Sequence, residues 1–344
     1  MTCRPYIRAF LLGACLLLAA PFVSATPPDT STAAQAQALD TVLDDAQTMS
    51  PLRTVLVARD GIVLAERGYH GASPTRPANI KSASKSVVSA LVGIAIERGL
   101  LEGVDQPIAP LLADRLPPDP DPRLAQVTIG HLLSMQAGLE STSGRGYGSW
   151  VAQRDWVRAA LARPFAQAPG GTMVYSTGST HLLSAILTRV GGKPTRELAR
   201  EWLGPQAGFA IASWDRDPQG IDFGGNQMAM TPRSLLAFGE IYRNHGRSTS
   251  GEQLLPATWI AQSWVPRTRS VYTGDGYGYG WFARTIGGQD VRFAWGHGGQ
   301  MLYVVPALGM TVAMTSDPDA RAAGSGHLAD LHALLARILG TQAG

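Results

Sequence analysis

The feature that most constrains the fold is a stretch from Ser86 to Gly99 that is apolar on nearly every side of a helix. Such a helix cannot lie on a surface, because none of its faces is polar enough to meet water. The chain must therefore pack other elements around it, and Gly99 is a suitable helix stop. With 344 residues, 45% of them hydrophobic and 16% charged, the chain is large enough to enclose this helix in a substantial core.

The elements around this helix change in character along the chain. Asp60-Gly61 separates two apolar, β-rich runs and predicts a hairpin over 53–65. Helices are expected over 36–49, 128–133, 150–161, 180–190, 196–203 and 232–245, then strands over 277–285, 291–295, 301–305 and 310–315, and an amphipathic helix over 327–339. This order predicts an α+β fold whose antiparallel sheet is built from both ends of the chain.

The N-terminus has the pattern of an export signal. Arg4 and Arg8 precede an apolar run over 9–20, and small residues follow that suit cleavage after Ala25. We therefore expect export, with the periplasm as the favoured destination. Secretion from the cell and a lipid anchor at Cys15 are the alternatives.

Cysteine content and charge exclude several classes of protein. Cys3 and Cys15 are the only cysteines, and both lie in the predicted signal, so the mature chain is expected to lack disulfides, a cysteine nucleophile and cysteine-ligated zinc. A net charge of +3 gives little attraction for nucleic acid. No later stretch approaches the roughly 18 apolar residues of a membrane span. The histidines show no metal-ligand spacing, so neither a metal nor a cofactor is expected.

A candidate nucleophile stands at the start of the apolar helix, in Ser82-Ala83-Ser84-Lys85. Residues three apart share a helical face, so the Ser82 hydroxyl and the Lys85 ammonium are predicted to meet. A hydroxyl becomes a good nucleophile only when a base takes its proton, and lysine can be that base when burial lowers its pKa. The chain has only three lysines, Lys81, Lys85 and Lys193.

Two later segments carry groups that suit the same chemistry. Tyr175-Ser176-Thr177 follows a Pro-Gly-Gly turn, and a tyrosine beside a buried lysine can act as general acid or base. His297-Gly298-Gly299 follows a predicted strand, and its glycines would let the backbone approach a ligand closely. Each segment also has a plainer interpretation: Tyr175 as a packed core tyrosine, and His297 as an exposed residue in a tight turn.

In order and spacing, these three motifs resemble those of the penicillin-recognising serine hydrolases. The likeness is strongest to the class C β-lactamase-related branch of esterases, D-aminopeptidases and 6-aminohexanoate-dimer hydrolases. Residues 128–139 are similar to the family segment T-I-x-H-L-L-x-x-x-S-G-L, with Ala137 at the usual hydroxyl position, and residues 169–183 to P-G-x-x-x-x-Y-S-x-x-x-x-x-L-L. The resemblance extends over about residues 40 to 340.

The resemblance implies a role for each site residue. Ser82 would be the acylated nucleophile, with Lys85 and Tyr175 as the proton-transfer pair. His297, Gly298 and Gly299 would occupy the family's Lys-Thr-Gly position, and the backbone N–H groups of Ser82 and Gln300 would form the oxyanion hole.

The resemblance also implies a β-lactamase/transpeptidase-like fold, in which a five-stranded antiparallel sheet flanked by helices lies beside a mostly helical lobe. The expected organisation is a signal peptide at 1–25, a linker at 26–35 and one domain at 36–344. In that domain, the sheet lobe would comprise about 36–110 and 270–344, and the helical insert about 111–269.

Two departures from the family pattern bear on the substrate. Thr177 stands where β-lactamases and penicillin-binding proteins have asparagine, and its hydroxyl reaches less far toward a substrate amide. His297 stands where they have lysine, which weakens carboxylate recognition at neutral pH. Both favour an exported serine esterase or amidase acting on a small ester, amide or peptide. The alternatives are a true β-lactamase or D-Ala-D-Ala peptidase, and a non-catalytic cell-wall or peptide sensor. The sequence does not indicate the oligomeric state.

Several other residues have two interpretations. Gln300 either contacts the substrate or is an ordinary strand residue, and the charges at 215–217 are expected to be solvated. Acyl specificity is expected to reside in the loops at 140–156 and 213–226. The following aromatic residues either line the cleft or belong to the core: Trp150, Trp156, Tyr272, Tyr277, Tyr279 and Trp281.

Overall fold

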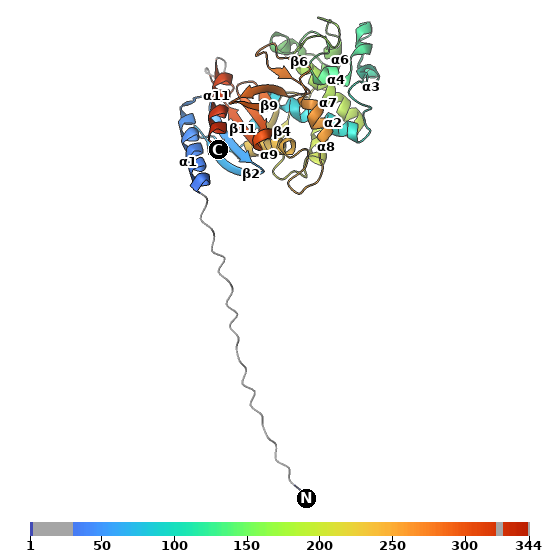
Figure 1. Ribbon diagram of the computed structural model, residues 1–344. Helices are drawn as coiled ribbons and strands as arrows, with labels where there is room; N and C mark the ends of the chain where they lie inside the picture. Colours follow the sequence, from blue (N-terminus) through green and yellow to red (C-terminus); the bar gives the residue numbers. More distant parts are fainter. Residues whose placement is uncertain (3–29, 321–325, 343–344) are drawn as a thin grey trace.

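The computed structural model describes residues 1–2, 30–320 and 326–342, so nearly all of the expected signal peptide lies outside the described residues (Figure 1). The first helix, α1 (Thr30–Asp45), begins inside the range expected to be a linker. The linker prediction is therefore wrong from Thr30 onward. Alanine and glutamine dominate residues 33–38, and these strong helix formers explain the early start.

The main sheet is antiparallel and has eight strands in the order β2-β1-β11-β10-β9-β8-β7-β6. Its strands are β1 (Leu52–Arg59), β2 (Ile62–Gly68), β6 (Thr268–Arg269), β7 (Gly276–Tyr277), β8 (Phe282–Ile286), β9 (Gln289–Gly296), β10 (Gln300–Val305) and β11 (Met310–Ser316). Because β1 pairs with β11, both ends of the chain build the sheet, as expected. The implied count of five strands is wrong: the hairpin β1–β2 and the four strands β8–β11 already make six, and the two-residue strands β6 and β7 extend the edge beyond β8.

The turn between β1 and β2 confirms the hairpin predicted at Asp60-Gly61. Both residues have positive φ, 50° for Asp60 and 83° for Gly61. A two-residue I′ turn requires this combination, and its twist matches that of the flanking strands. The turn sets the register, which places Arg59 opposite Ile62.

Helices cover both faces of the main sheet (Figure 1). On one face, α1 and α11 (His327–Gly340) enclose a core of large apolar side chains that includes Phe293. On the other face, α9 (Pro232–Arg243) lies so close that a Cβ added at Gly239 would be 2.5 Å from Thr311 Cγ2. Since α9 belongs to the expected helical insert but packs on the sheet, the expected boundary does not separate the two lobes.

The remaining helices form the mostly helical part of the molecule around α2 (Ser84–Glu97). They are α3 (Ile108–Leu111), α4 (Ile129–Leu133), α5 (Tyr147–Val151), α6 (Trp156–Leu161), α7 (Thr177–Gly191), α8 (Thr195–Trp202) and α10 (Ala257–Trp264). Every residue of α2 from Ser84 to Ala95 is buried, which confirms the predicted enclosed helix.

Two predicted elements are each interrupted in the structure. The helix expected over 150–161 is divided into α5 and α6, because Asp155 caps the start of α6 by accepting a hydrogen bond from the Arg158 backbone N–H at 2.9 Å. The strand expected over 277–285 is divided into β7 and β8 by a turn in which Gly280 has φ 78°.

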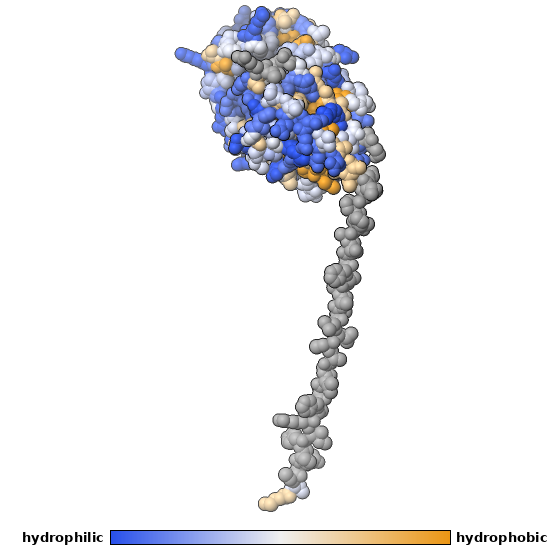
Figure 2. Space-filling model, turned by 90° about the vertical axis from the view of Figure 1, so that its left-hand side faces the viewer, coloured by the Kyte–Doolittle hydropathy of each residue, from blue (hydrophilic) through white to orange (hydrophobic). Residues whose placement is uncertain are grey.

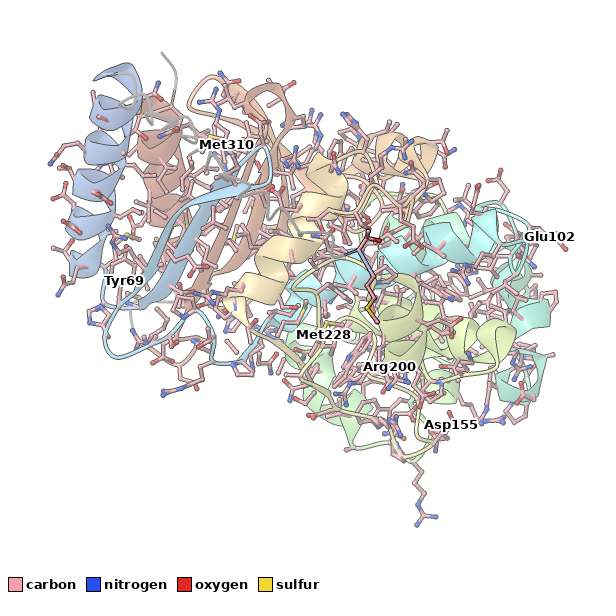
Figure 3. The ribbon with its side chains drawn as sticks, turned by 90° about the horizontal axis from the view of Figure 1, so that it is seen from below. Tyr69, Glu102, Asp155, Arg200, Met228 and Met310 are labelled. Atoms are coloured by element: carbon pink, nitrogen blue, oxygen red, sulfur yellow. The ribbon has the colours of Figure 1, made fainter. Side chains whose placement is uncertain are left out.

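The start of α2 lies where the two lobes meet. A short 3-10 turn, Lys81–Ala83, leads into α2 and contacts β9 and β10 of the main sheet. A second, three-stranded sheet of β3 (Ala78–Asn79), β5 (Met228–Met230) and β4 (Ser213–Trp214) lies nearby. Figure 3 shows Met228 of this small sheet at the junction, with Met310 in the main sheet and Arg200 and Asp155 in the helical part.

The surface seen in Figure 2, on the side that carries α1, is mostly hydrophilic with scattered hydrophobic residues. The exposed large apolar side chains include Ile62, Val63 and Leu64 of the edge strand β2. Within the described parts of the chain, no helix is both long and apolar enough to cross a membrane.

Candidate active site

The structure brings Ser82 and Lys85 into contact, as their spacing predicts. Ser82 lies in the 3-10 turn and Lys85 in the first turn of α2, and the Lys85 Nζ is 3.1 Å from the Ser82 Oγ. Consecutive helical turns place these side chains on one face. The contact is therefore a local consequence of the Ser-x-x-Lys spacing.

The environment of Lys85 favours its uncharged form. Lys85 is 3% exposed, and burial lowers its pKa from the ordinary 10.5 to about 7. Its Nζ also donates a hydrogen bond of 2.7 Å to the Gly225 carbonyl. None of the described carboxylates forms an ion pair with it that would hold the proton in place. At neutral pH, a large fraction of Lys85 can therefore accept a proton from Ser82.

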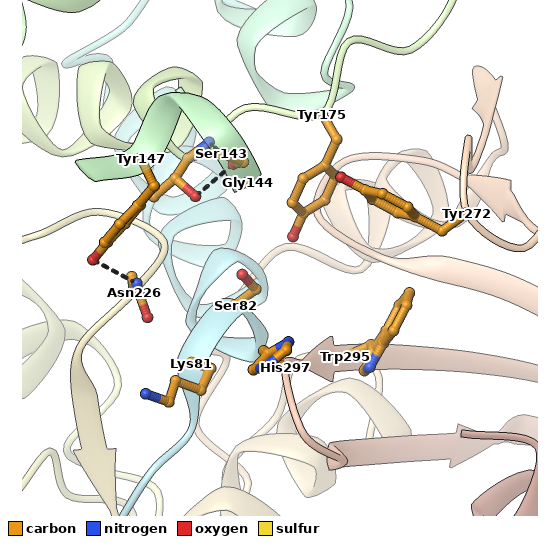
Figure 4. Close-up of a pocket in the computed structure, with 11 residues that line it drawn as sticks. Lys81, Ser82, Ser143, Gly144, Tyr147, Tyr175, Asn226, Tyr272, Trp295 and His297 are labelled. Atoms are coloured by element: carbon orange, nitrogen blue, oxygen red, sulfur yellow. Dashed lines mark hydrogen bonds between the residues drawn. The ribbon is translucent and has the colours of Figure 1, made fainter. Parts of the chain in front are cut away.

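Tyr175 approaches the same pair from the segment that precedes α7. Lys85 Nζ is 5.1 Å from the centre of the Tyr175 ring, and Figure 4 shows the phenol directed toward Ser82. Burial raises the pKa of Tyr175 well above its usual range, and its contact with the Ser82 hydroxyl offsets part of the rise. The Ser141 hydroxyl fixes the backbone here by donating to the Tyr175 carbonyl at 2.6 Å. Tyr175 therefore keeps its proton under conditions in which Lys85 readily loses one.

Ser82 opens onto a cavity of about 540 Å³ (Figure 4). One wall is aromatic: the rings of Tyr175 and Tyr272 are 5.8 Å apart, and those of Tyr272 and Trp295 are 6.4 Å apart. Tyr272 is 60% exposed and stands at the mouth. This wall offers apolar contacts to a substrate group. Of the aromatic residues with two interpretations, Tyr272 is the one that lines the cavity.

The opposite wall is polar and comes from the two loops expected to carry specificity. Asn226 Nδ2 donates to the Tyr147 hydroxyl at 3.0 Å. The Thr177 and Ser143 hydroxyls lie 2.9 Å apart. An amide therefore does reach the cavity, from Asn226 rather than from the motif position that Thr177 occupies. Sequence reasoning did not single out Asn226, Tyr147 or Ser143, since only the fold brings their segments to the motif. Lys81 is adjacent to Ser82 in the sequence and was named there only as one of the three lysines.

The segment 297–300 contributes less to the cavity than the sequence suggests. His297 is exposed and lines the cavity. Gly298 and Gly299 have φ of 78° and 97°, and a Cβ on them would lie 2.3 Å from Pro318 Cα and 2.8 Å from His327 Nε2. These glycines are needed for a tight turn packed against its neighbours, rather than for an approach to a ligand.

Gln300 does not extend its side chain into the cavity. It is 1% exposed, and its Nε2 donates to the Ser316 carbonyl of β11 at 2.6 Å. The suggestion of a substrate contact by this side chain is therefore wrong. Side chains alternate between the two faces of a strand, and the Gln300 side chain lies on a face of β10 that is buried within the protein. The role of its backbone N–H in an oxyanion hole stays a prediction.

The charges at 215–217 are not all solvated, which corrects a second expectation. Asp217 is 5% exposed and lies 3.1 Å from Nε2 of the buried His181 on α7. Its carboxylate also accepts backbone hydrogen bonds from Gln219 and Ile221 at 2.8 and 2.9 Å. The pair anchors the loop that ends at Gly225, and so supports the carbonyl that holds Lys85.

Several candidate residues lie in the core instead of at the cavity. Trp150 and Trp156 are 5.4 Å apart and pack with Phe223 and His181. Tyr277, Tyr279 and Trp281 are buried. Among the residues that the structure describes, no cluster of three or more His, Cys, Asp or Glu could hold a metal ion.

Comparison with known proteins places this fold in a family. The family model Beta-lactamase matches residues 46–337. The chain therefore belongs to the beta-lactamase family, which confirms the resemblance seen in the sequence. A search of the curated proteins finds no match.

Solved structures share the fold at low sequence identity. EstCE1, described as a hydrolase with promiscuous acyltransferase activity, is 17% identical with a TM-score of 0.68, over 92% of this chain and 100% of its own. A D-amino acid amidase from Ochrobactrum anthropi SV3 is 15% identical with a TM-score of 0.69, over 89% and 98%. A Bacillus anthracis protein provisionally named a 6-aminohexanoate-dimer hydrolase is 19% identical with a TM-score of 0.71, over 94% and 85%.

Proposed function

We propose that the protein is a serine hydrolase that cleaves a carboxylic ester or amide through an acyl-enzyme on Ser82. The observation that carries this proposal is the contact of 3.1 Å between the Ser82 Oγ and a buried Lys85 whose pKa is about 7. A hydroxyl next to a base that is partly uncharged at neutral pH is the arrangement that nucleophilic catalysis needs.

In the acylation step, neutral Lys85 takes the proton of Ser82 as its oxygen attacks the substrate carbonyl. Tyr175 then donates its phenol proton to the leaving alkoxide or amine, and the Lys85 ammonium returns a proton to Tyr175. Each group acts in the form that its environment favours, because burial lowers the pKa of Lys85 and raises that of Tyr175. The net result is transfer of the Ser82 proton to the leaving group.

In the deacylation step, water attacks the acyl carbonyl and gives a proton to Lys85. The Ser82 oxygen leaves the acyl group and takes that proton back, which regenerates the starting state. In both steps the backbone N–H groups of Ser82 and Gln300 are proposed to stabilise the oxyanion. All protons are supplied by the three side chains and water.

The polar wall supports an esterase or amidase rather than an efficient β-lactamase. Thr177 is buried at 4% exposure, and its hydroxyl already bonds Ser143, so it has little capacity left for a substrate amide. The structural neighbours named as an esterase-type hydrolase and an amidase agree with this preference, though only through their shared fold.

The test is intact-mass spectrometry after incubation with a fluorophosphonate, followed by peptide mapping. We expect a single adduct on Ser82 that is absent in Ser82→Ala and strongly reduced in Lys85→Met. Absence of any serine adduct would contradict the proposal and favour the non-catalytic sensor. Rapid nitrocefin turnover or stable labelling by a fluorescent penicillin would instead favour β-lactamase or D-Ala-D-Ala peptidase activity.

We further propose that the protein acts outside the cytoplasm, because its N-terminal pattern matches an export signal. Cell fractionation of the full-length chain, with N-terminal sequencing of the product, tests this. We expect a periplasmic product that begins near Thr26. An uncleaved cytoplasmic product would contradict it.

A further inference from the structure

Two of the chain's three lysines lie at the candidate site, and the mechanism uses only one of them. Lys85 is the buried base. Lys193 forms an ion pair of 2.6 Å with Glu201, away from the cavity. Lys81 directly precedes Ser82, is half-buried and lines the cavity. Lys81 is therefore a cation beside the nucleophile with no role yet assigned.

We infer that Lys81 binds an anionic group of the substrate, so that the enzyme prefers esters or amides that carry a carboxylate. This inference rests on the proposed function, since it names the substrate class of the same site. The replacement of the family's lysine by His297 led us to expect weak carboxylate recognition. Under this inference Lys81, elsewhere in the cavity, supplies the missing positive charge.

The charge balance of the cavity supports this role. The residues that line it include no aspartate or glutamate, and within the described residues no carboxylate pairs with Lys81 within 4.0 Å. Asp215, in the same loop as Asn226, is instead bonded by the Gln227 amide at 3.3 Å. A cation that no protein carboxylate neutralises gives the cavity a net attraction for anions.

The backbone at Lys81 is held in an unusual conformation that orients the side chain. Its φ of 51° is uncommon for a residue other than glycine, and such residues gather at functional sites. Asn79 Oδ1 accepts from the Lys81 N–H at 2.9 Å, and the Ser84 hydroxyl donates to the Lys81 carbonyl at 2.8 Å. Asn79 Nδ2 also donates to Gln227 Oε1 at 2.6 Å, which ties Lys81 to the Asn226 loop.

The position of Lys81 predicts where the anionic group lies in the substrate. Figure 4 shows the Lys81 side chain directed to the side of Ser82 where Asn226 lies, away from Tyr272 and Trp295. The carboxylate would bind beside neutral hydrogen-bonding groups, and the apolar part of the substrate would bind against the aromatic wall. The preferred substrate is thus an ester or amide with an anionic group on one side of the scissile bond and an apolar group on the other.

The test compares matched pairs of 4-nitrophenyl esters, one neutral and one anionic: butyrate with hemisuccinate, pentanoate with hemiglutarate, and hexanoate with hemiadipate. The quantity measured is the ratio of kcat/KM for the anionic ester to that for its neutral partner. We expect at least one pair with a ratio well above one in the wild type. In Lys81→Met, that ratio should fall at least about tenfold through a rise in KM for the anionic ester.

Three further variants control for structural effects. Lys81→Asn also removes the charge but tolerates the left-handed backbone, and should lower the ratio as Lys81→Met does. Lys81→Arg keeps the charge and should retain much of the preference. Lys193→Met removes a lysine remote from the cavity and should leave the ratio unchanged. An unchanged ratio in both neutral Lys81 variants would overturn the inference.

A binding measurement separates this inference from the proposed function. Calorimetric titration of Ser82→Ala with the uncleaved anionic ester should show at least about tenfold weaker binding when Lys81→Met is added. If the wild type hydrolyses no ester but this difference persists, the proposed function fails while anion binding by Lys81 stands. Equal binding by the single and double variants overturns the inference whether or not the enzyme is active.

Discussion

The floor and the rim of the cavity meet at Ser82, and they differ in how strongly burial disfavours the charged form of a lysine. By the floor we mean the buried groups behind the Ser82 side chain, which are Lys85, Gly225 and the Tyr175 hydroxyl, and Lys85 there is 3% exposed. The rim consists of Lys81, Tyr272 and His297, and Tyr272 there is 60% exposed. Burial in the floor makes a charged lysine unfavourable, whereas Lys81 at the rim is only half-buried.

Under the two proposals above, one residue type performs two tasks four positions apart. An ammonium in the floor loses hydration that no carboxylate replaces, so its pKa falls to about 7, which suits its proposed role as the base. At the rim, Lys81 is half-buried and lines the cavity, and we infer that it attracts anions. Environment, rather than residue identity, assigns the chemistry, and this can be tested from each side.

The largest effect is expected in the floor, from Lys85→Met. Methionine has similar length and suits a buried position, so folding should be preserved while the base is lost. We expect kcat to fall by about a thousandfold, within the range for removal of a general base. Steady-state hydrolysis of a neutral ester checks this, with Lys193→Met as the control. Retention of a tenth of wild-type kcat would show that Lys85 is not the base.

The next effect concerns Gly225, whose carbonyl holds Lys85. A Cβ at this position would lie 2.9 Å from Lys85 Nζ, so Gly225→Ala should displace the amine and lower kcat by about a hundredfold. Gly220 is a matched control, since its φ of 84° equals the 83° of Gly225 within a degree but a Cβ there meets nothing within 4 Å.

Both alanine variants should lose about 1 kcal/mol of stability from the positive φ. Only Gly225→Ala should lose activity. Equal kcat in the two variants would mean that the contact between the Gly225 carbonyl and Lys85 does not position the base.

The pH dependence of kcat/KM for a neutral ester should follow the titration of Lys85 in the floor and not that of any rim residue. With the pKa of Lys85 lowered to about 7, its base form disappears as pH falls, so kcat/KM for a neutral ester should decrease about tenfold per unit below pH 7. Because burial raises the pKa of Tyr175, its proton should remain in place to well above pH 9. A profile from pH 5 to 9 should show one limb and a plateau. A limb that persists unchanged in Lys85→Met would assign the titration to another group.

The free energy of unfolding should also depend on the titration of Lys85, and the lowered pKa fixes the direction of that dependence. Between pH 7 and 10.5 the unfolded chain keeps Lys85 protonated while the folded protein does not, so the unfolded state binds more protons. The free energy of unfolding should therefore rise with pH across this window. Urea titrations at intervals of pH should show that Lys85→Met has a smaller slope than the wild type. Parallel curves would indicate an ordinary pKa for Lys85.

The smallest effect is expected at the rim, from Tyr272→Ala. Its exposed ring supplies one apolar surface of the cavity mouth, so we expect KM for an ester with a bulky apolar group to rise a few-fold, with kcat nearly unchanged. Val271→Ala, which removes the adjacent side chain at 61% exposure, serves as the control. A large loss of kcat would place Tyr272 in the floor chemistry and break the distinction between the two regions.

Much of the fold follows from periodicity and turn chemistry. The apolar helix, the Asp60-Gly61 hairpin and the C-terminal strands are each recognisable from about fifteen residues or fewer of local pattern. Interruptions were harder to predict, since the division at Asp155 depends on a cap and the turn at Gly280 on a single left-handed residue. The placement of α9 on the sheet could not be predicted from its own residues, because an amphipathic helix does not indicate which surface covers its apolar face.

The sequence by itself determined the contact between Ser82 and Lys85, because helical geometry joins residues three apart wherever the helix lies. It also determined family membership through the order of the motifs. Only the tertiary structure decided that the Gly225 carbonyl, 140 residues along the chain, would hold Lys85, that Asn226 would reach the cavity, and that Asp217 would be buried against His181. These contacts depend on a loop over 215–226 whose path is set by the packing of the whole molecule, and packing leaves no periodic trace in the sequence.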